Sequence, residues 1–210
     1  MAYDLEEQEK LEALRAWWER YGTLLVALAV VVAIGVLGWR GWQWYQGNRA
    51  VQAMGYFEAL EMAAAEPGEE SQTRIKAASE TLRKDFPNSG YASRGALLAS
   101  QALAARGDFS ASTEQLRWVM QSKDPALAGL ARLRLAGLEL EQKRYDEALA
   151  LLKDPPAGFD GLYTDRRGDI LFAQGERAGA REAWEAALKT LAGDPLAQVV
   201  QLKIDALAGA

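Results

Sequence analysis

An uncharged apolar run near the N-terminus constrains the fold of this chain more than any other feature. Residues 21–39 contain no Asp, Glu, Lys or Arg, and Thr23 is the one polar aliphatic residue among them. As a helix the run would be about 28 Å long, which is close to the thickness of the hydrocarbon core of a bilayer. The sequence therefore predicts a single membrane-spanning helix, with membrane lipid as a partner.

Aromatic side chains lie at both ends of this run. Five of the seven tryptophans in the chain are in the run or within five residues of it. Indole and phenol rings favour the headgroup level of a membrane, where one edge of the ring is wet and the rest is apolar. The predicted interface residues are Trp17, Trp18 and Tyr21 before the span, and Trp39, Trp42, Trp44 and Tyr45 after it.

Three other interpretations fit the run less well. A cleaved signal peptide would have a basic start and a shorter apolar segment, whereas this chain starts with an acidic stretch. A buried helix of a soluble fold would need apolar partners that the rest of the chain does not supply. An interfacial helix would need a charged face, and residues 21–39 have none.

Basic residues near the span favour one orientation. Lys10, Arg15 and Arg20 precede the run, while Arg40 and Arg49 follow it closely. An excess of basic residues favours the cytoplasmic side, so we expect residues 1–20 to form an acidic cytoplasmic tail. A tail this short crosses a membrane in either direction, so the opposite orientation stays open.

The tail carries an apolar stripe of its own. Leu11, Leu14, Trp18 and Tyr21 recur at helical spacing, which predicts that the membrane helix continues outward. Such a stripe is either a solvated extension of the helix or a docking surface for a cytoplasmic partner.

The rest of the chain repeats one helical layout three times. Aligned at Gly107, Lys143 and Gly175, the units recur after 36 and then 32 residues. Small residues stand seven before and five after each turn, and a bulky residue follows four later. These positions are Ser100, Ala136 and Gly168; then Ser112, Ala148 and Ala180; then Leu116, Leu152 and Trp184.

This spacing suits stacked helix pairs. Two antiparallel helices that cross closely need small residues at the crossing, and one pair cannot bury its own apolar face, so pairs stack. An earlier pair is expected around residues 48–85, broken at Pro67, and a last helix over residues 195–207 would cap the stack. We therefore predict an all-α fold, in which residues 21–45 form a transmembrane helix with aromatic belts and residues 46–210 form a tetratricopeptide-like α-solenoid.

Composition excludes several kinds of function. The chain has no Cys and no His, which removes thiolate and disulfide chemistry and the commonest general base and metal ligand. Its net charge of −5 argues against nucleic acid as a partner. No phosphate-binding loop occurs, and the paired carboxylates are typical of solvated helix faces. We expect a protein that is not an enzyme and has no cofactor or metal; a hydrolase that uses carboxylates alone is the remaining catalytic alternative.

A binding site is expected on the concave face of the stack. In tetratricopeptide folds the first helix of each pair lines that face, and a mixed apolar and polar lining suits extended peptide segments. The candidate groove residues are Arg94, Leu97 and Gln101, then Leu133, Gly137 and Leu140, then Asp165, Asp169 and Phe172.

Five segments carry a resemblance to a known family. They are residues 12–22 and 38–42 around the span, residues 165–171 with 179–187 in the third unit, and residues 202–207 near the C-terminus. In these segments the chain resembles the ancillary SecYEG translocon subunit family, the YfgM-like membrane-anchored tetratricopeptide proteins. The resemblance covers nearly the whole chain.

The resemblance implies location and partners that the residues alone do not. It implies a single-pass protein of the bacterial inner membrane with a periplasmic C-terminal domain, associated with the SecYEG translocon. It also implies a second partner, a membrane-anchored periplasmic chaperone of the prolyl-isomerase type (PpiD-like), to which secreted proteins are handed over. The alternative is a membrane-tethered regulator that sequesters a cytoplasmic signalling protein, such as a response regulator.

Overall fold

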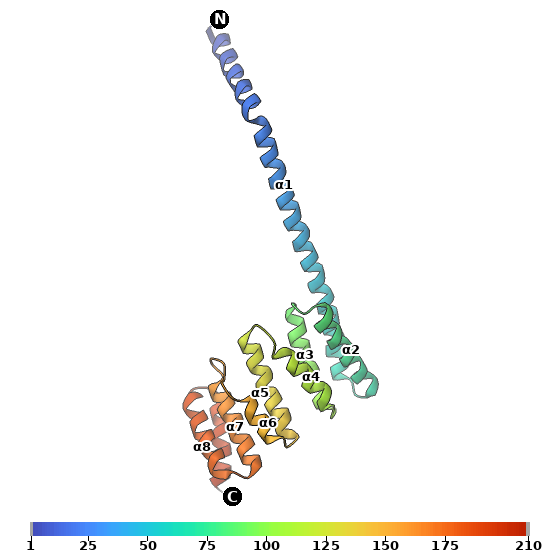
Figure 1. Ribbon diagram of the computed structural model, residues 1–210, viewed down its shortest axis with the longest axis vertical. Helices are drawn as coiled ribbons and strands as arrows, with labels where there is room; N and C mark the ends of the chain where they lie inside the picture. The colour runs from blue at the N-terminus through green and yellow to red at the C-terminus, as the bar shows by residue number, and fades with distance from the viewer. Residues whose placement is uncertain (1, 209–210) are drawn as a thin grey trace. The chain divides into compact units, whose positions relative to one another are not determined.

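The computed structural model describes residues 2–208 of the chain, with side chains from residue 9 to 207, and this part is helical without any strand. Figure 1 shows the helices in chain order. They are α1 (Ala2–Ala65), α2 (Glu69–Asp85), α3 (Gly90–Ala104), α4 (Phe109–Val119), α5 (Pro125–Glu141), α6 (Tyr145–Leu151), α7 (Asp160–Gln174), α8 (Arg177–Thr190) and α9 (Leu196–Ala208). The all-α prediction is confirmed.

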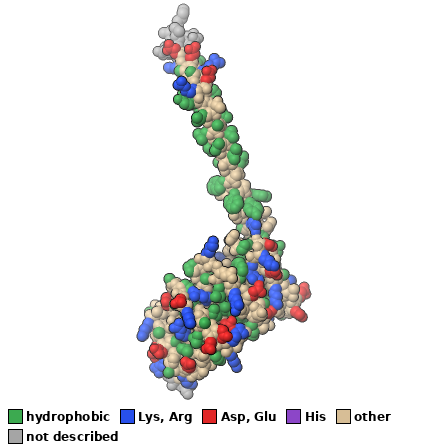
Figure 2. Space-filling view, viewed as in Figure 1, with side chains coloured by type: hydrophobic (Ala, Val, Ile, Leu, Met, Phe, Trp, Pro, Cys, Tyr) green, Lys and Arg blue, Asp and Glu red, His purple; other side chains and the backbone are tan. Residues whose placement is uncertain are grey.

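The chain divides into two compact units, residues 1–51 and residues 52–210. The first unit is a single stretch of α1, whose apolar side chains are exposed along the helix (Figure 2). A core helix of a soluble protein would bury those side chains, so this part of α1 has the length and surface of a membrane span. The tail is helical as predicted, because α1 already begins at Ala2.

The second unit is a row of antiparallel helix pairs. The last turns of α1 pack with α2 and α3 in one buried cluster. Further along the chain, α3 pairs with α4, α5 with α6 and α7 with α8, while α9 packs on α8. The nine small and bulky positions predicted at the helix crossings are all buried. In the first of these crossings the hydroxyls of Ser100 and Ser112 are 2.9 Å apart and share a hydrogen bond. This repeated crossing is what defines a tetratricopeptide-like stack.

The turn at the centre of each unit has the same backbone. Gly107, Lys143 and Gly175 have φ values of 78°, 60° and 88°, in the left-handed region. At each turn the next residue donates its backbone N–H to the carbonyl five positions earlier, for example Arg144 to Glu139 at 2.9 Å. This is the Schellman ending of a helix, and it reverses the chain in few residues.

Side-chain caps and prolines set the helix boundaries. Ser89, Asp108 and Asp124 accept hydrogen bonds from backbone N–H groups in the first turns of α3, α4 and α5. Two consecutive prolines, Pro155 and Pro156, follow the short helix α6, which has seven residues. Proline lacks the N–H that a helix interior requires, so the second helix of this unit cannot extend through these residues.

Arg106 links the end of α1 to the repeats through hydrogen bonds. Its guanidinium donates to the carbonyls of Ala64 at 3.1 Å and Glu66 at 2.7 Å, and also to Ala102 in α3. The last turn of α1 has no basic residue of its own. Arg106 therefore supplies the positive charge that a helix C-terminus favours.

Candidate protein-binding surface

The groove residues predicted on α3 separate into exposed and buried ones. Arg94 and Gln101 are exposed, and each has a free path to solvent. Leu97 is 8% exposed and packs in the core with residues of α4 and α5. Of the three groove positions predicted on α3, the two polar ones are therefore accessible to a peptide.

On α5 the predicted groove residues form a partly covered surface. Leu133 and Leu140 are half-buried and pack against the cluster that contains Tyr163 and Leu152. A Cβ added at Gly137 would lie 3.6 Å from the guanidinium of Arg166, which is ordinary contact. Arg166 of α7 thus lies beside the middle of α5.

On α7 the two predicted groove aspartates, Asp165 and Asp169, form ion pairs with a lysine of the same chain. The ammonium of Lys203, on α9, lies 2.7 Å from Asp165 Oδ1 and 2.7 Å from Asp169 Oδ1. Asp165 is buried and Asp169 is half-buried. Two carboxylates at i, i+4 share one face of a helix, and a single lysine pairs with both. These two side chains therefore hold α9 against α7 through ion pairs with Lys203.

Trp184 completes this cluster. Its indole N–H donates to Asp169 Oδ1 at 3.2 Å, and the Lys203 ammonium lies 5.8 Å from the centre of its ring. The ring rests on Gly168, where an added Cβ would collide with it. Burial raises the pKa of the Asp165 carboxyl, and the hydrogen bond from Lys203 offsets part of that effect.

Phe172 is the apolar groove residue that the structure leaves most accessible. Its side chain is 47% exposed, and its ring centre lies 5.7 Å from that of Trp184. Together with Arg94 and Gln101 it makes up the accessible part of the predicted groove. Isolated phenylalanines of this exposure are normal on protein surfaces, so contact with a partner must be tested directly.

The cluster of Asp165, Asp169, Trp184 and Lys203, called here the Lys203 cluster, could not be predicted from the sequence. The spacing of Asp165 and Asp169 showed that both share a helix face, but no local signal names a partner 38 residues away. Its members come from the segments of the third unit and the C-terminus that carry the family resemblance. Those segments are therefore joined in space by the ion pairs of Lys203.

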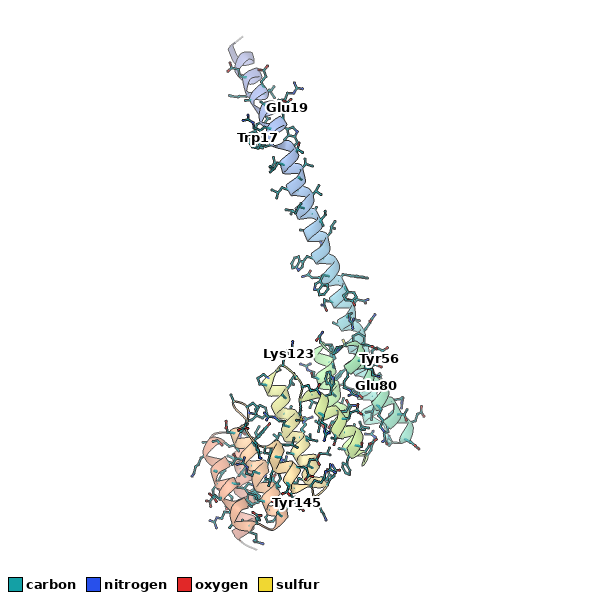
Figure 3. All side chains as sticks on the ribbon, viewed as in Figure 1. Trp17, Glu19, Tyr56, Glu80, Lys123 and Tyr145 are labelled. Carbon is teal, nitrogen blue, oxygen red and sulfur yellow. The ribbon has the colours of Figure 1, made fainter. Side chains whose placement is uncertain are left out.

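The aromatic residues predicted at the membrane interface are exposed along α1. Trp17 and Tyr21 form a tilted ring pair at 5.8 Å between centres, and Trp42 and Tyr45 form another at 6.3 Å. Trp18 covers Gly22, where a Cβ would be 3.0 Å from the indole. Figure 3 labels Trp17 on the helix, next to Glu19. Trp39 and Trp44 are 63% and 73% exposed.

No group of three or more Asp and Glu side chains that could hold a metal ion occurs among the described residues.

Comparison with known proteins matches almost the whole chain. The model of a family described as a tetratricopeptide repeat-like domain matches residues 15–209. A protein of Neisseria gonorrhoeae named ancillary SecYEG translocon subunit is 31% identical over 99% of this chain and 100% of its own length. Proteins of the same name from Escherichia coli and Haemophilus influenzae are 29% and 26% identical, over 96% and 89% of this chain and 96% and 91% of their own lengths. No solved structure matches the chain.

Proposed function

Since the chain belongs to the ancillary SecYEG translocon subunit family and has its tetratricopeptide repeat-like domain, we propose that it is a subunit associated with the SecYEG channel. Family membership identifies a non-catalytic scaffold protein, and the apolar part of α1 fits membrane anchoring. The match from end to end, which includes the span as well as the repeats, is the observation that carries the proposal.

Residues 1–20 are assigned to the cytoplasm, residues 21–45 to the inner membrane and residues 46–210 to the periplasm. The three basic residues before the span, against two after it, support this orientation. In this arrangement the repeats work on the side of the membrane where secreted proteins emerge. They scaffold the hand-over of those proteins to a membrane-anchored chaperone of the prolyl-isomerase type.

Protease access in spheroplasts tests the orientation. A tag is placed after Ala210, and external protease is added to intact spheroplasts. Digestion of the tag and the repeats, while a cytoplasmic control protein survives, is the expected result. Protection until the membrane is lysed would place the repeats in the cytoplasm and would remove the chaperone hand-over from the proposal.

Site-specific photo-crosslinking tests the groove. A crosslinking residue replaces Gln101 or Phe172, which are exposed on the predicted binding face, or Ala186, which is exposed on α8 as a control. We expect crosslinks to the channel or to the chaperone from the first two positions. Equal yields from all three would mean that the groove is not where partners bind.

An observation on the tail favours the second candidate function, sequestration of a cytoplasmic signalling protein. Leu11, Leu14 and Trp18 are 65%, 61% and 56% exposed and form an apolar stripe on one side of the helix. Leu11 lies about 15 Å along the helix from Tyr21, which is beyond the headgroup layer of a straight span. Lipid therefore does not cover Leu11, at the outer end of this stripe, when α1 stands upright in the membrane.

Leu14→Asp separates the two functions. If the tail holds a signalling protein, the variant releases that protein while channel association persists. Retention of every partner by the variant would leave the stripe as a solvated extension of the helix.

A further inference from the structure

A polar hollow lies outside the predicted groove, between α4 and the turn that joins α5 to α6. Its volume is about 470 Å³. Its lining residues are Phe109, Ser110, Thr113, Glu114 and Arg117 of α4, with Gln142 and Arg144 of the turn. We call it the α4 hollow.

Local structure explains why these side chains meet. Ser110, Thr113 and Arg117 recur at three and four residues, so they share the outer face of α4, while Ser112 and Leu116 on the opposite face are buried. The left-handed residue Lys143 turns the chain so that Arg144 and Gln142 both border α4.

The charges within the hollow are unevenly paired. The guanidinium of Arg83 lies 2.8 Å from Glu114 Oε1, and the buried carboxylate of Glu139 accepts from Arg144. Arg117 is exposed and has no ion pair or hydrogen bond within the described part of the chain. Once these pairs are counted, one unneutralised positive charge faces the hollow.

Two hydroxyl groups in the hollow are also without a partner. The hydroxyls of Ser110 and Thr113 make no hydrogen bond to another described residue. Beside the free guanidinium of Arg117, each of these hydroxyls can donate one hydrogen bond to a bound group. The ring of Phe109 adds an apolar wall.

We propose that the α4 hollow binds an acidic side chain of a partner polypeptide. A guanidinium presents paired N–H groups that match the two oxygens of a carboxylate, and neighbouring hydroxyls can donate to the same group. The hollow is an open surface depression, which suits a side chain of an extended segment, and Phe109 accommodates an apolar residue next to the acidic one. This site would add a contact for acidic segments outside the predicted groove.

A matched pair of charge reversals tests the site. Arg117 is in the last turn of α4, and Lys189 is in the last turn of α8, exposed and remote in sequence. Arg117→Glu and Lys189→Glu therefore change the net charge and the helix-terminus charge equally, but only the first lies in the hollow.

Binding is measured by fluorescence anisotropy with the full chain in neutral-lipid nanodiscs. The probe is a labelled peptide that carries two glutamates beside a leucine, and its control has glutamine in place of glutamate. We expect the glutamate peptide to bind more tightly than the glutamine peptide. Arg117→Glu should weaken binding by about ten-fold, and Lys189→Glu should leave it within about two-fold.

Three results would overturn the proposal: equal binding of both peptides, equal effects of the two reversals, or binding of anionic vesicles in place of the peptide. The reverse preference, in which Arg117→Glu binds a lysine-bearing version of the peptide, would support it strongly. The assay contains no translocon, so its outcome does not depend on the function proposed above.

Discussion

Lys143 occupies a turn position that the two neighbouring units fill with glycine. Its φ of 60° places a side chain in the left-handed region, which costs about 1–2 kcal/mol for a residue with a Cβ. Lys143→Gly should therefore raise the free energy of unfolding by about 0.5–1 kcal/mol, after the greater flexibility of glycine in the unfolded chain is subtracted. Denaturant unfolding of the chain in neutral detergent measures this change. Lys143→Ala, which removes the charge but keeps the Cβ, should not stabilise the protein.

Burial of Asp165 makes stability depend on pH. Because the pKa of this carboxyl is higher in the folded protein than in the unfolded chain, its charged form is disfavoured by folding. Its contribution to the free energy of unfolding is therefore full below the unfolded pKa and declines as the pH rises through the folded pKa. Relative to Asp165→Asn, the wild type should gain stability as the pH falls from about 7 towards 4. An unchanged difference between the two proteins across this range would contradict the prediction.

Residues within one helix pair were predictable from the sequence, and contacts between distant segments were not. Ser100, Ala136 and Gly168 were identified because each recurs at a fixed distance from a turn, and the turn is local. The partner of Asp165 was not identified, because Lys203 is brought to it only by the packing of α9. The α4 hollow was missed for the same reason, since Arg117 and Arg144 belong to different units.

At the level of helices, the end of α1 depends on a residue from another pair. Arg106 is in the turn between α3 and α4, and its hydrogen bonds to Ala64 and Glu66 reach back about 40 residues. Hydrogen bonds from a charged donor are worth about 1.5–3 kcal/mol, so Arg106→Ala should destabilise the repeats by about 2 kcal/mol. Hydrogen exchange should also show faster exchange in the last turn of α1. Arg74→Ala is the control, because Arg74 pairs with Glu66 through an exposed contact, and its loss should have a small effect.

Helix boundaries were predictable where a capping residue or a proline fixes them. Asp124 before Pro125 gives the start of α5, and Pro155 follows the short α6. The length of α1 was less evident from its sequence, since the membrane span and the first repeat helix were expected as neighbouring segments and are one continuous helix. No proline lies between Trp39 and Ala65, and the three glycines in this stretch weaken the helix without ending it.

For the whole molecule, the division at residue 51 makes the repeats a candidate for independent folding. The buried clusters of the second unit draw all their residues from position 53 onward. The first of these clusters includes Ala53, Leu60 and Ala63, which belong to α1 and are at most 1% exposed. The last turns of α1 are thus part of the solenoid, although they continue the helix that contains the span.

Two truncations therefore have opposite outcomes. A fragment of residues 52–210 should be soluble, helical and cooperative in unfolding, because it keeps the complete core and omits the exposed apolar run. A fragment of residues 66–210 removes Leu60, whose loss alone from a filled core costs about 2–5 kcal/mol, and it leaves Ile75 and Leu82 without their cover. That deficit is a large part of the stability of an ordinary domain, so the shorter fragment should unfold at much lower denaturant concentration or aggregate. Circular dichroism during denaturant titration compares them. Equal midpoints would show that the first pair does not need α1, and that the repeat domain begins at α2.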